Sequence, residues 1–214
     1  GNMYKEGRCV ISNAFLYMDE NGQSVDVNWP LSYYKKAFEW FEKAAKQEYA
    51  KAQYNLGVMY HNGYGVGVDY KKAVEWYKKA AEQGHANAQY NLGVIYQVWP
   101  NDLGKGVDVN YKEAFEWYEK AAEQGVASAQ WQMAMMYDRG KNYKKAIEWY
   151  EKAAEQGLAL AQYNLGVIYD EGKDVDVDYM KAIHWYEKAA EQGVVKARTA
   201  LIAVQDAMAK KEKG

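Results

Sequence analysis

The chain has 214 residues and a formal net charge of −2, with 27 basic and 29 acidic side chains. This balance argues against nucleic-acid binding, which requires a basic surface, and gives no steering toward acidic membranes. Because Cys9 is the only cysteine, the chain cannot form an intrachain disulfide. The sequence contains no run of about 20 apolar residues, so no membrane span is predicted.

The first segment, residues 1–32, is expected to be a capping helix followed by a loop. Apolar residues recur at helical spacing from Cys9 to Met18. The letters SVDVN at 24–28 nearly repeat GVDVN at 106–110, which indicates a loop of the same kind. Pro30 and Ser32, a residue type that favours N-caps, then predict a helix over Tyr33–Gln47.

Two short words recur through residues 33–193. The word KAAEQG occurs four times, beginning at Lys79, Lys120, Lys152 and Lys188. The word YNLGV begins at Tyr54, Tyr90 and Tyr163, and WQMAM replaces it at Trp131. A word that recurs every 32 to 41 residues is the signature of a solenoid, in which neighbouring units bury a shared core. We therefore expect four helical hairpins followed by a fifth first helix.

Each unit is expected to contain a first-type helix, which begins with the YKKA word, and a second-type helix, which holds the YNLGV word. In the first-type helix Tyr143–Gln156, helical periodicity places Ala146, Ile147, Trp149, Tyr150, Ala153 and Ala154 on one face. An Asp or Asn precedes most first-type helices as an N-cap, and a Gly follows their last turn. As a core truncation, Trp149→Ala is expected to cost about 3–5 kcal/mol.

The combined pattern resembles the Sel-like repeat (SLR) family, a relative of the tetratricopeptide repeats. The residues that carry it in the last unit are Ala161, Leu165, Gly166, Tyr169, Lys181, Ala182, Trp185, Tyr186, Lys188, Ala189, Ala190 and Gly193. The resemblance implies an all-α, right-handed superhelical solenoid of antiparallel helical hairpins that acts as a protein-interaction scaffold. Three residues depart from the pattern: Glu48 for the hairpin Gly, Ala134 for the Gly of the second helix, and Phe41 for a Tyr.

The last segment, residues 194–214, is expected to be a C-terminal capping helix. It lacks the LG pair, and one apolar stripe runs along it, made of Ala197, Leu201, Val204 and Met208. The closing lysines suit the negative end of a helix dipole.

The candidate binding site is a stripe on the second-type helices. With Leu165 in the core, Tyr163 points nearly the opposite way and Asn164 lies to one side. The residues of this aromatic–amide stripe are Tyr54, Asn55, Tyr90, Asn91, Trp131, Gln132, Tyr163 and Asn164. The stripe is expected to line a concave groove that binds a partner, because inner helices of such arrays face a concave surface. The alternative is that these aromatics pack on the neighbouring hairpin.

A second candidate is the insertion in the 41-residue step, which carries Trp99 outside the repeat frame. Long loops on regular repeats often bind partners, and the alternative is that Trp99 folds back on its own hairpin. Because the loop lies outside the core, deleting residues 98–102 is expected to leave stability nearly intact.

No catalytic, cofactor or metal site is predicted. The letters DVDVD at 174–178 resemble the start of a calcium loop, but Tyr179 and Trp185 stand where Gly and Glu are required. The three histidines, His61, His85 and His184, share no spacing suited to zinc or to general-base catalysis.

These patterns predict a monomeric, non-enzymatic scaffold that binds a protein or peptide in its groove, as a bacterial adaptor or regulator. One alternative is an inhibitor or immunity protein for a cognate toxin or enzyme. Another is a hydrolase of cell-wall or β-lactam substrates, which is an activity among cysteine-rich relatives of the resembled family. The start Gly1-Asn2-Met3 leaves the compartment open: periplasmic or secreted if a leader is removed, and cytoplasmic otherwise.

Overall fold

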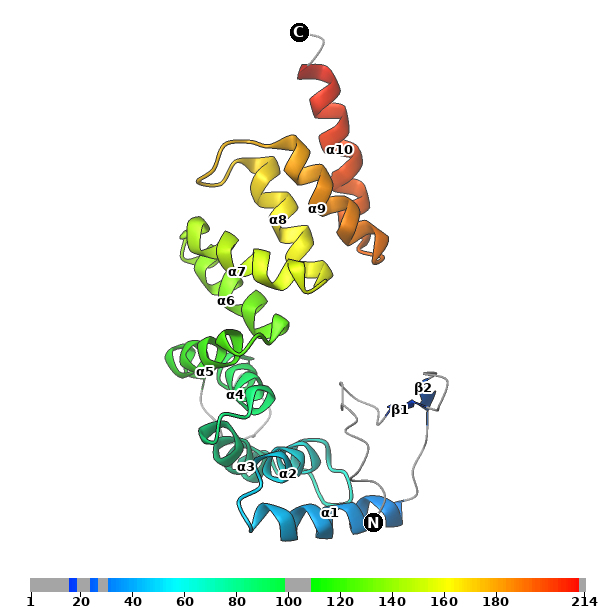
Figure 1. Ribbon diagram of the computed structural model, residues 1–214, viewed down its shortest axis with the longest axis vertical. Coiled ribbons are helices and arrows are strands. Elements are labelled where there is room, and N and C mark those ends of the chain that lie inside the picture. Colours follow the sequence, from blue (N-terminus) through cyan, green and yellow to red (C-terminus); the bar gives the residue numbers. More distant parts are fainter. Residues whose placement is uncertain (1–15, 19–23, 27–30, 99–108, 212–214) are drawn as a thin grey trace.

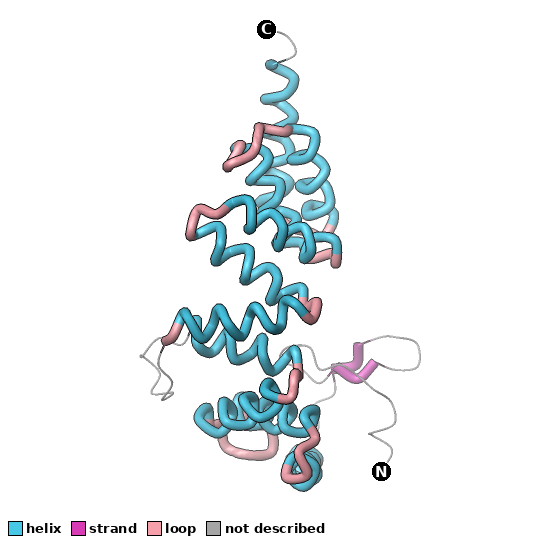
Figure 2. Tube along the Cα trace, turned by 60° about the vertical axis from the view of Figure 1, so that its left-hand side comes forward, coloured by secondary structure: helices cyan, strands magenta, loops and turns pink. Residues whose placement is uncertain are grey.

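The computed structural model describes residues 16–18, 24–26, 31–98 and 109–211. Its described ranges contain ten helices: α1 (Leu31–Ala45), α2 (Ala50–Asn62), α3 (Tyr70–Glu82), α4 (Ala86–Val98), α5 (Tyr111–Glu123), α6 (Ala127–Arg139), α7 (Tyr143–Glu155), α8 (Ala159–Glu171), α9 (Tyr179–Glu191) and α10 (Val195–Lys211). The helices stack in chain order into an elongated array, with α1 and α10 at opposite ends (Figure 1). Successive helices run antiparallel and the turns lie along the edges (Figure 2). The predicted all-α, right-handed solenoid is confirmed.

The N-terminal segment differs from the expected capping helix where it is described. Strand β1 (Leu16–Met18) pairs antiparallel with strand β2 (Ser24–Asp26). The expected helix over Cys9–Met18 is therefore wrong for its last three residues, and its earlier residues lie outside the described part. Short apolar runs fit either periodicity, so spacing alone does not separate helix from strand there. Helix α1 begins directly after Pro30, at Leu31, two residues before the predicted start.

The ends of the first-type helices follow the sequence closely. The side chains of Asp69, Asn110, Asn142 and Asp178 accept hydrogen bonds from backbone N–H groups three residues on, at 3.0–3.3 Å. The glycines that follow the last turns, Gly84, Gly125, Gly157 and Gly193, have φ between 85° and 88°. These values lie in the left-handed region, which glycine adopts without the steric penalty of a Cβ. Caps and turns thus set where each helix ends.

Glu48 occupies the same turn position with φ of 64°. Because a side chain in this conformation is strained, Glu48→Gly is expected to raise the free energy of unfolding by about 1 kcal/mol. Chemical denaturation of both proteins measures the difference. The matched control is Gly84→Glu, which places the same strain one repeat later and should lower stability by a similar amount. A loss of stability in the Glu48→Gly protein contradicts the strain argument.

Each second-type helix packs closely on the first-type helix that follows it, to which a variable loop connects it. A Cβ on Gly57, Gly93 or Gly166 would lie 2.4–2.5 Å from a ring carbon of Tyr77, Tyr118 or Tyr186 respectively. Real Cβ atoms do not approach so closely, so the Gly of the LG word makes room for a tyrosine ring. These helix pairs pack more extensively than the pairs joined by the tight turns.

The tyrosine of each WY pair, not the tryptophan, fills the core. Tyr77, Tyr118, Tyr150 and Tyr186 are at most 2% exposed. Trp149 is only half-buried, and the Lys152 Nζ lies 4.0 Å from its ring centroid, in a cation–π contact that recurs through the array. Trp149 thus packs against the core, as predicted, but is not fully buried, because neighbouring helix positions differ by about 100° and Tyr150 is the member of the pair that points fully inward.

A buried glutamine in each second-type helix connects neighbouring repeats. Gln53, Gln89, Gln130 and Gln162 are 3–6% exposed, and each donates its Nε2 to an alanine carbonyl eight residues earlier, at 3.0–3.3 Å. The Oε1 of each also accepts a hydrogen bond, at 2.7–2.8 Å, from the glutamine directly after the next first-type helix: Gln83, Gln124, Gln156 or Gln192. We call these four pairs the glutamine ladder. The ladder provides hydrogen-bond partners for the glutamine side chains that are buried at each turn.

Candidate partner-binding face

The second-type helices α2, α4, α6 and α8 expose a face that differs from that of the first-type helices. The aromatic–amide stripe lies on this face, and all eight of its residues are half-buried. The exposed face of a first-type helix carries alternating charges instead, such as Lys144, Lys145, Glu148, Lys152 and Glu155 of α7. The array therefore presents one surface of aromatic rings and amides and another of mixed charge.

The tyrosines of the stripe contribute to packing as well as to this surface. Tyr54, Tyr90 and Tyr163 each lie with ring centroids 5.9 Å from the buried tyrosine of the next first-type helix: Tyr77, Tyr118 and Tyr186. The tilted geometry, with interplanar angles of 40–47°, is favourable for aromatic pairs. Each ring is half-buried and contacts the core, so replacing these tyrosines would affect folding.

The four amides of the stripe fall into two classes. Asn91 donates to the hydroxyl of Tyr77, and Asn164 donates to the hydroxyl of Tyr150 at 3.0 Å. The side-chain amides of Asn55 and Gln132 make no hydrogen bond to any residue of the described ranges. The reason is visible in the preceding helices, because Phe41 has no hydroxyl to offer Asn55, and the Tyr118 hydroxyl donates to Gln97 at 2.6 Å. Only Asn55 and Gln132 are thus available without breaking an internal contact.

Helix α6 departs most from the repeat. Trp131 replaces the tyrosine of the stripe, and its Nε1 is buried with no hydrogen-bond partner among the described residues. Met135 stands where the other second-type helices have Val, and its Sδ receives the Asn164 Nδ2 at 3.5 Å. A buried N–H group without a partner and an adaptable methionine make α6 the least regular of the second-type helices.

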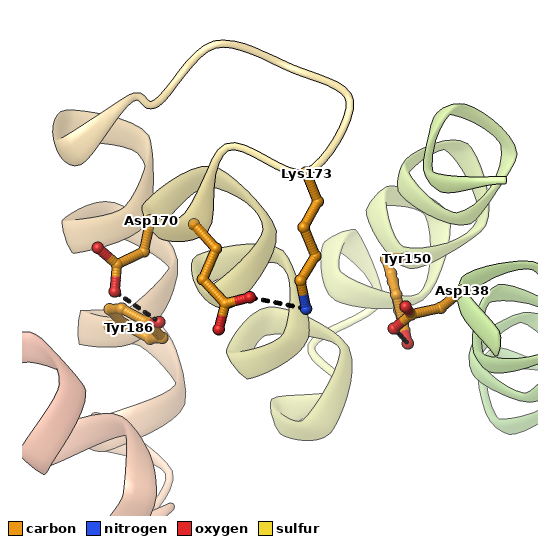
Figure 3. A network of polar contacts seen from close by, with 6 residues as sticks. Asp138, Tyr150, Asp170, Lys173 and Tyr186 are labelled. Atoms are coloured by element: carbon orange, nitrogen blue, oxygen red, sulfur yellow. Dashed lines mark hydrogen bonds and ion pairs between the residues drawn. The ribbon is translucent and has the colours of Figure 1, made fainter. Parts of the chain in front are cut away.

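Two aspartates that were not predicted from the sequence extend the stripe. Asp138 and Asp170 lie two helical turns beyond Trp131 and Tyr163, so they share the same face. Their Oδ2 atoms accept hydrogen bonds from the Tyr150 and Tyr186 hydroxyls, at 3.3 and 3.4 Å (Figure 3). Burial and the nearby Asp138 charge raise the pKa of Tyr150, so this hydroxyl remains a donor. The seven-residue spacing was the signal that could have identified them.

His85 borders the stripe at the turn between α3 and α4. Its ring stacks on Tyr54 with centroids 4.5 Å apart, and its Nδ1 accepts from the Ala88 N–H at 3.3 Å. Burial, reinforced by the positive charge of Lys51, lowers the pKa of His85. The neutral ring is therefore the form that the fold favours, as stacking and capping both require.

Stability should consequently depend on pH through His85. The pKa of this group is lower in the folded chain than in the unfolded chain, where it is about 6.5. Protons then bind the unfolded chain preferentially, and the free energy of unfolding should fall as pH decreases from about 7.5 through the folded pKa. Urea titrations of wild type and His85→Val at several pH values measure the slope of the free energy of unfolding against pH. Valine is chosen because Val126 occupies the equivalent position in the next repeat. An equally steep slope in His85→Val contradicts the assignment.

The second predicted candidate, Trp99, lies outside the described residues. Among the residues that are described, no group of three or more His, Cys, Asp or Glu side chains is arranged to hold a metal ion. None of the helices in the same ranges is long and apolar enough to span a membrane.

The fold and this face define an α-solenoid of helical repeats. The Sel1 repeat model matches the chain five times, at residues 14–49, 50–85, 86–126, 127–158 and 159–194. The chain therefore belongs to the Sel1 repeat family, which confirms the resemblance. Each of the last four matches begins with a second-type helix and ends after the next first-type helix, the pair that packs most closely.

Two solved structures are similar over most of this chain. One is a protective antigen present in uropathogenic Escherichia coli strains that displays an SLR fold, with 39% identity and a TM-score of 0.70 over 78% of this chain and 36% of that one. The other is a Sel1 repeat protein from Oxalobacter formigenes, with 38% identity and a TM-score of 0.70 over 80% of this chain and 50% of that one. This chain thus matches half or less of each of those proteins. No curated protein matches it.

Proposed function

We propose that this chain is a non-enzymatic scaffold that binds a partner protein along the aromatic–amide stripe, as an adaptor or regulator. The observation that carries the proposal is the alignment of half-exposed aromatics and amides on one face of α2, α4, α6 and α8. Rigid aromatic rings supply contact area at low entropic cost, and unpaired amides bind peptide groups. Sel1 repeat folds are generally non-catalytic interaction scaffolds, which supports the same conclusion.

The test uses the two stripe amides that have no internal hydrogen bond. Asn55→Ala/Gln132→Ala should keep the melting temperature of wild type, because no hydrogen bond within the described ranges is lost. In affinity capture from a lysate of the source organism, this variant should recover at least about tenfold less of a specific partner. That loss corresponds to about 1.4 kcal/mol, which is typical of a few interface side chains.

The matched control is Glu75→Ala/Glu148→Ala, which truncates two exposed side chains on the first-type helices α3 and α7. It should retain the partner. If the control loses the partner and the Asn55/Gln132 variant retains it, the charged face binds and the proposal is wrong.

A further inference from the structure

The two aspartates of the exposed face accept hydrogen bonds from tyrosine hydroxyls, a role that the uncharged Gln97 fills for Tyr118, so it is only their charge that the fold disfavours. Asp138 and Asp170 are the next-to-last residues of α6 and α8, where the negative end of the helix dipole repels a carboxylate. The equivalent residues of α2 and α4 are His61 and Gln97, which carry no negative charge. A negative charge at this point in both C-terminal second-type helices therefore calls for a reason other than helix stability.

Neither aspartate forms an ion pair within the described ranges, because no cation there lies within ion-pair distance of either carboxylate. Lys173 lies between the two tyrosine–aspartate pairs in Figure 3, and its Nζ is bound to Glu171 at 2.8 Å. The charge of Asp138 also contributes to the raised pKa of Lys173, so Asp138 attracts this cation without a direct contact. Arg139 is exposed at the end of α6. Burial raises the pKa of Asp170, and Glu171 adds to this effect, so an external cation would gain by binding there.

Side-chain contacts connect helix α8 to Asp138 of α6. Asn164 of α8 contacts Met135 of α6 at 3.5 Å and the Tyr150 hydroxyl at 3.0 Å, and that hydroxyl reaches Asp138 at 3.3 Å. Gln132 lies on the same face of α6, is half-buried, and its side-chain amide has no hydrogen-bond partner among the described residues. One face thus combines two carboxylates, a soft thioether and a side-chain amide suited to main-chain carbonyl groups.

We propose that the face of α6 and α8 binds an extended polypeptide segment with basic side chains, whose Lys or Arg groups pair with Asp138 and Asp170. This inference deepens the proposed function and depends on it. The peptide main chain lies along Gln132 and the stripe aromatics, and the basic side chains extend to the tyrosine-bound carboxylates. Charge complementarity selects this occupant: carboxylates that are hydrogen-bonded by a hydroxyl and form no ion pair accept guanidinium or ammonium donors.

The experiment pans a random dodecapeptide phage library on the full chain. Enriched peptides should contain Lys or Arg pairs, and their affinity should fall at least about tenfold for Asp138→Asn/Asp170→Asn and weaken as salt rises from low to physiological concentration. Asn keeps an acceptor for each tyrosine hydroxyl, so the melting temperature of this variant should match or exceed that of wild type.

The matched control is Glu148→Gln/Glu155→Gln, which removes two charges from the exposed face of α7 and should leave affinity unchanged. Peptides that bind through Asn55 and Gln132 without basic residues, or that are insensitive to the aspartate variant, overturn this inference and leave the proposed function standing. A library that yields no peptide sensitive to either set of stripe variants overturns the inference, and the lysate capture then decides the proposed function separately.

Discussion

Replacing Tyr150 with Ala is expected to lower the free energy of unfolding by about 3–5 kcal/mol. Its side chain is 0% exposed and belongs to the same core cluster as Ala134, across the shortest of the variable loops. Truncation leaves a cavity at the junction between the third and fourth units, removes the hydroxyl that Asn164 binds and leaves Asp138 without its donor. Denaturant unfolding followed by circular dichroism measures the loss.

The neighbouring position provides the control. Trp149→Ala removes a larger side chain, but one that is half-buried and covered by Lys152, and it should cost about 1–3 kcal/mol. Tyr150→Phe, which keeps the ring and removes only the hydroxyl, should cost about 1 kcal/mol. If Trp149→Ala proves the more damaging of the two alanine variants, the packing described for the first-type helices is incorrect.

The second large effect concerns the glutamine ladder. Gln130→Ala should lower the free energy of unfolding by about 2–3 kcal/mol, because it removes a 3.1 Å bond to the Ala122 carbonyl and a 2.7 Å bond from Gln156. Two hydrogen bonds contribute about 0.5–1.5 kcal/mol each, and the void left by the side chain adds to the loss. Thermal and urea unfolding measure the change.

Two further variants separate these contributions. Gln130→Met keeps the volume and removes both hydrogen bonds, so it should show roughly half or more of the loss. Gln156→Ala truncates the exposed partner and should cost about 1 kcal/mol. If Gln130→Met is as stable as wild type, the ladder contributes only by filling space.

Most of the fold could be predicted from local patterns. The helices, their Asp and Asn caps and the turn glycines depend on residues within four positions of each other, so the local sequence is sufficient to predict them. The same holds for the repeat words that define the family. The N-terminal ribbon is the exception, because three-residue strands are too short for periodicity to identify.

Which amides of the stripe are free of internal hydrogen bonds required the tertiary structure. The position of the stripe follows from helical periodicity, but the availability of each amide depends on another repeat: Asn164 is occupied because Tyr150 supplies a hydroxyl, and Asn55 is free because Phe41 does not. The stripe remains a predicted binding site that the Asn55/Gln132 variant tests.

By itself, the sequence determined that this protein is an array of paired helices, because backbone propensities, caps and apolar periodicity act over a few residues. Only the tertiary structure decided which aromatic of each WY pair fills the core, and it alone paired glutamines that are 26 to 35 residues apart. It also showed that Asp138 and Asp170 accept hydrogen bonds from the hydroxyls of Tyr150 and Tyr186. These contacts depend on the distance and angle at which neighbouring repeats stack, and neither can be predicted from the sequence of a single repeat.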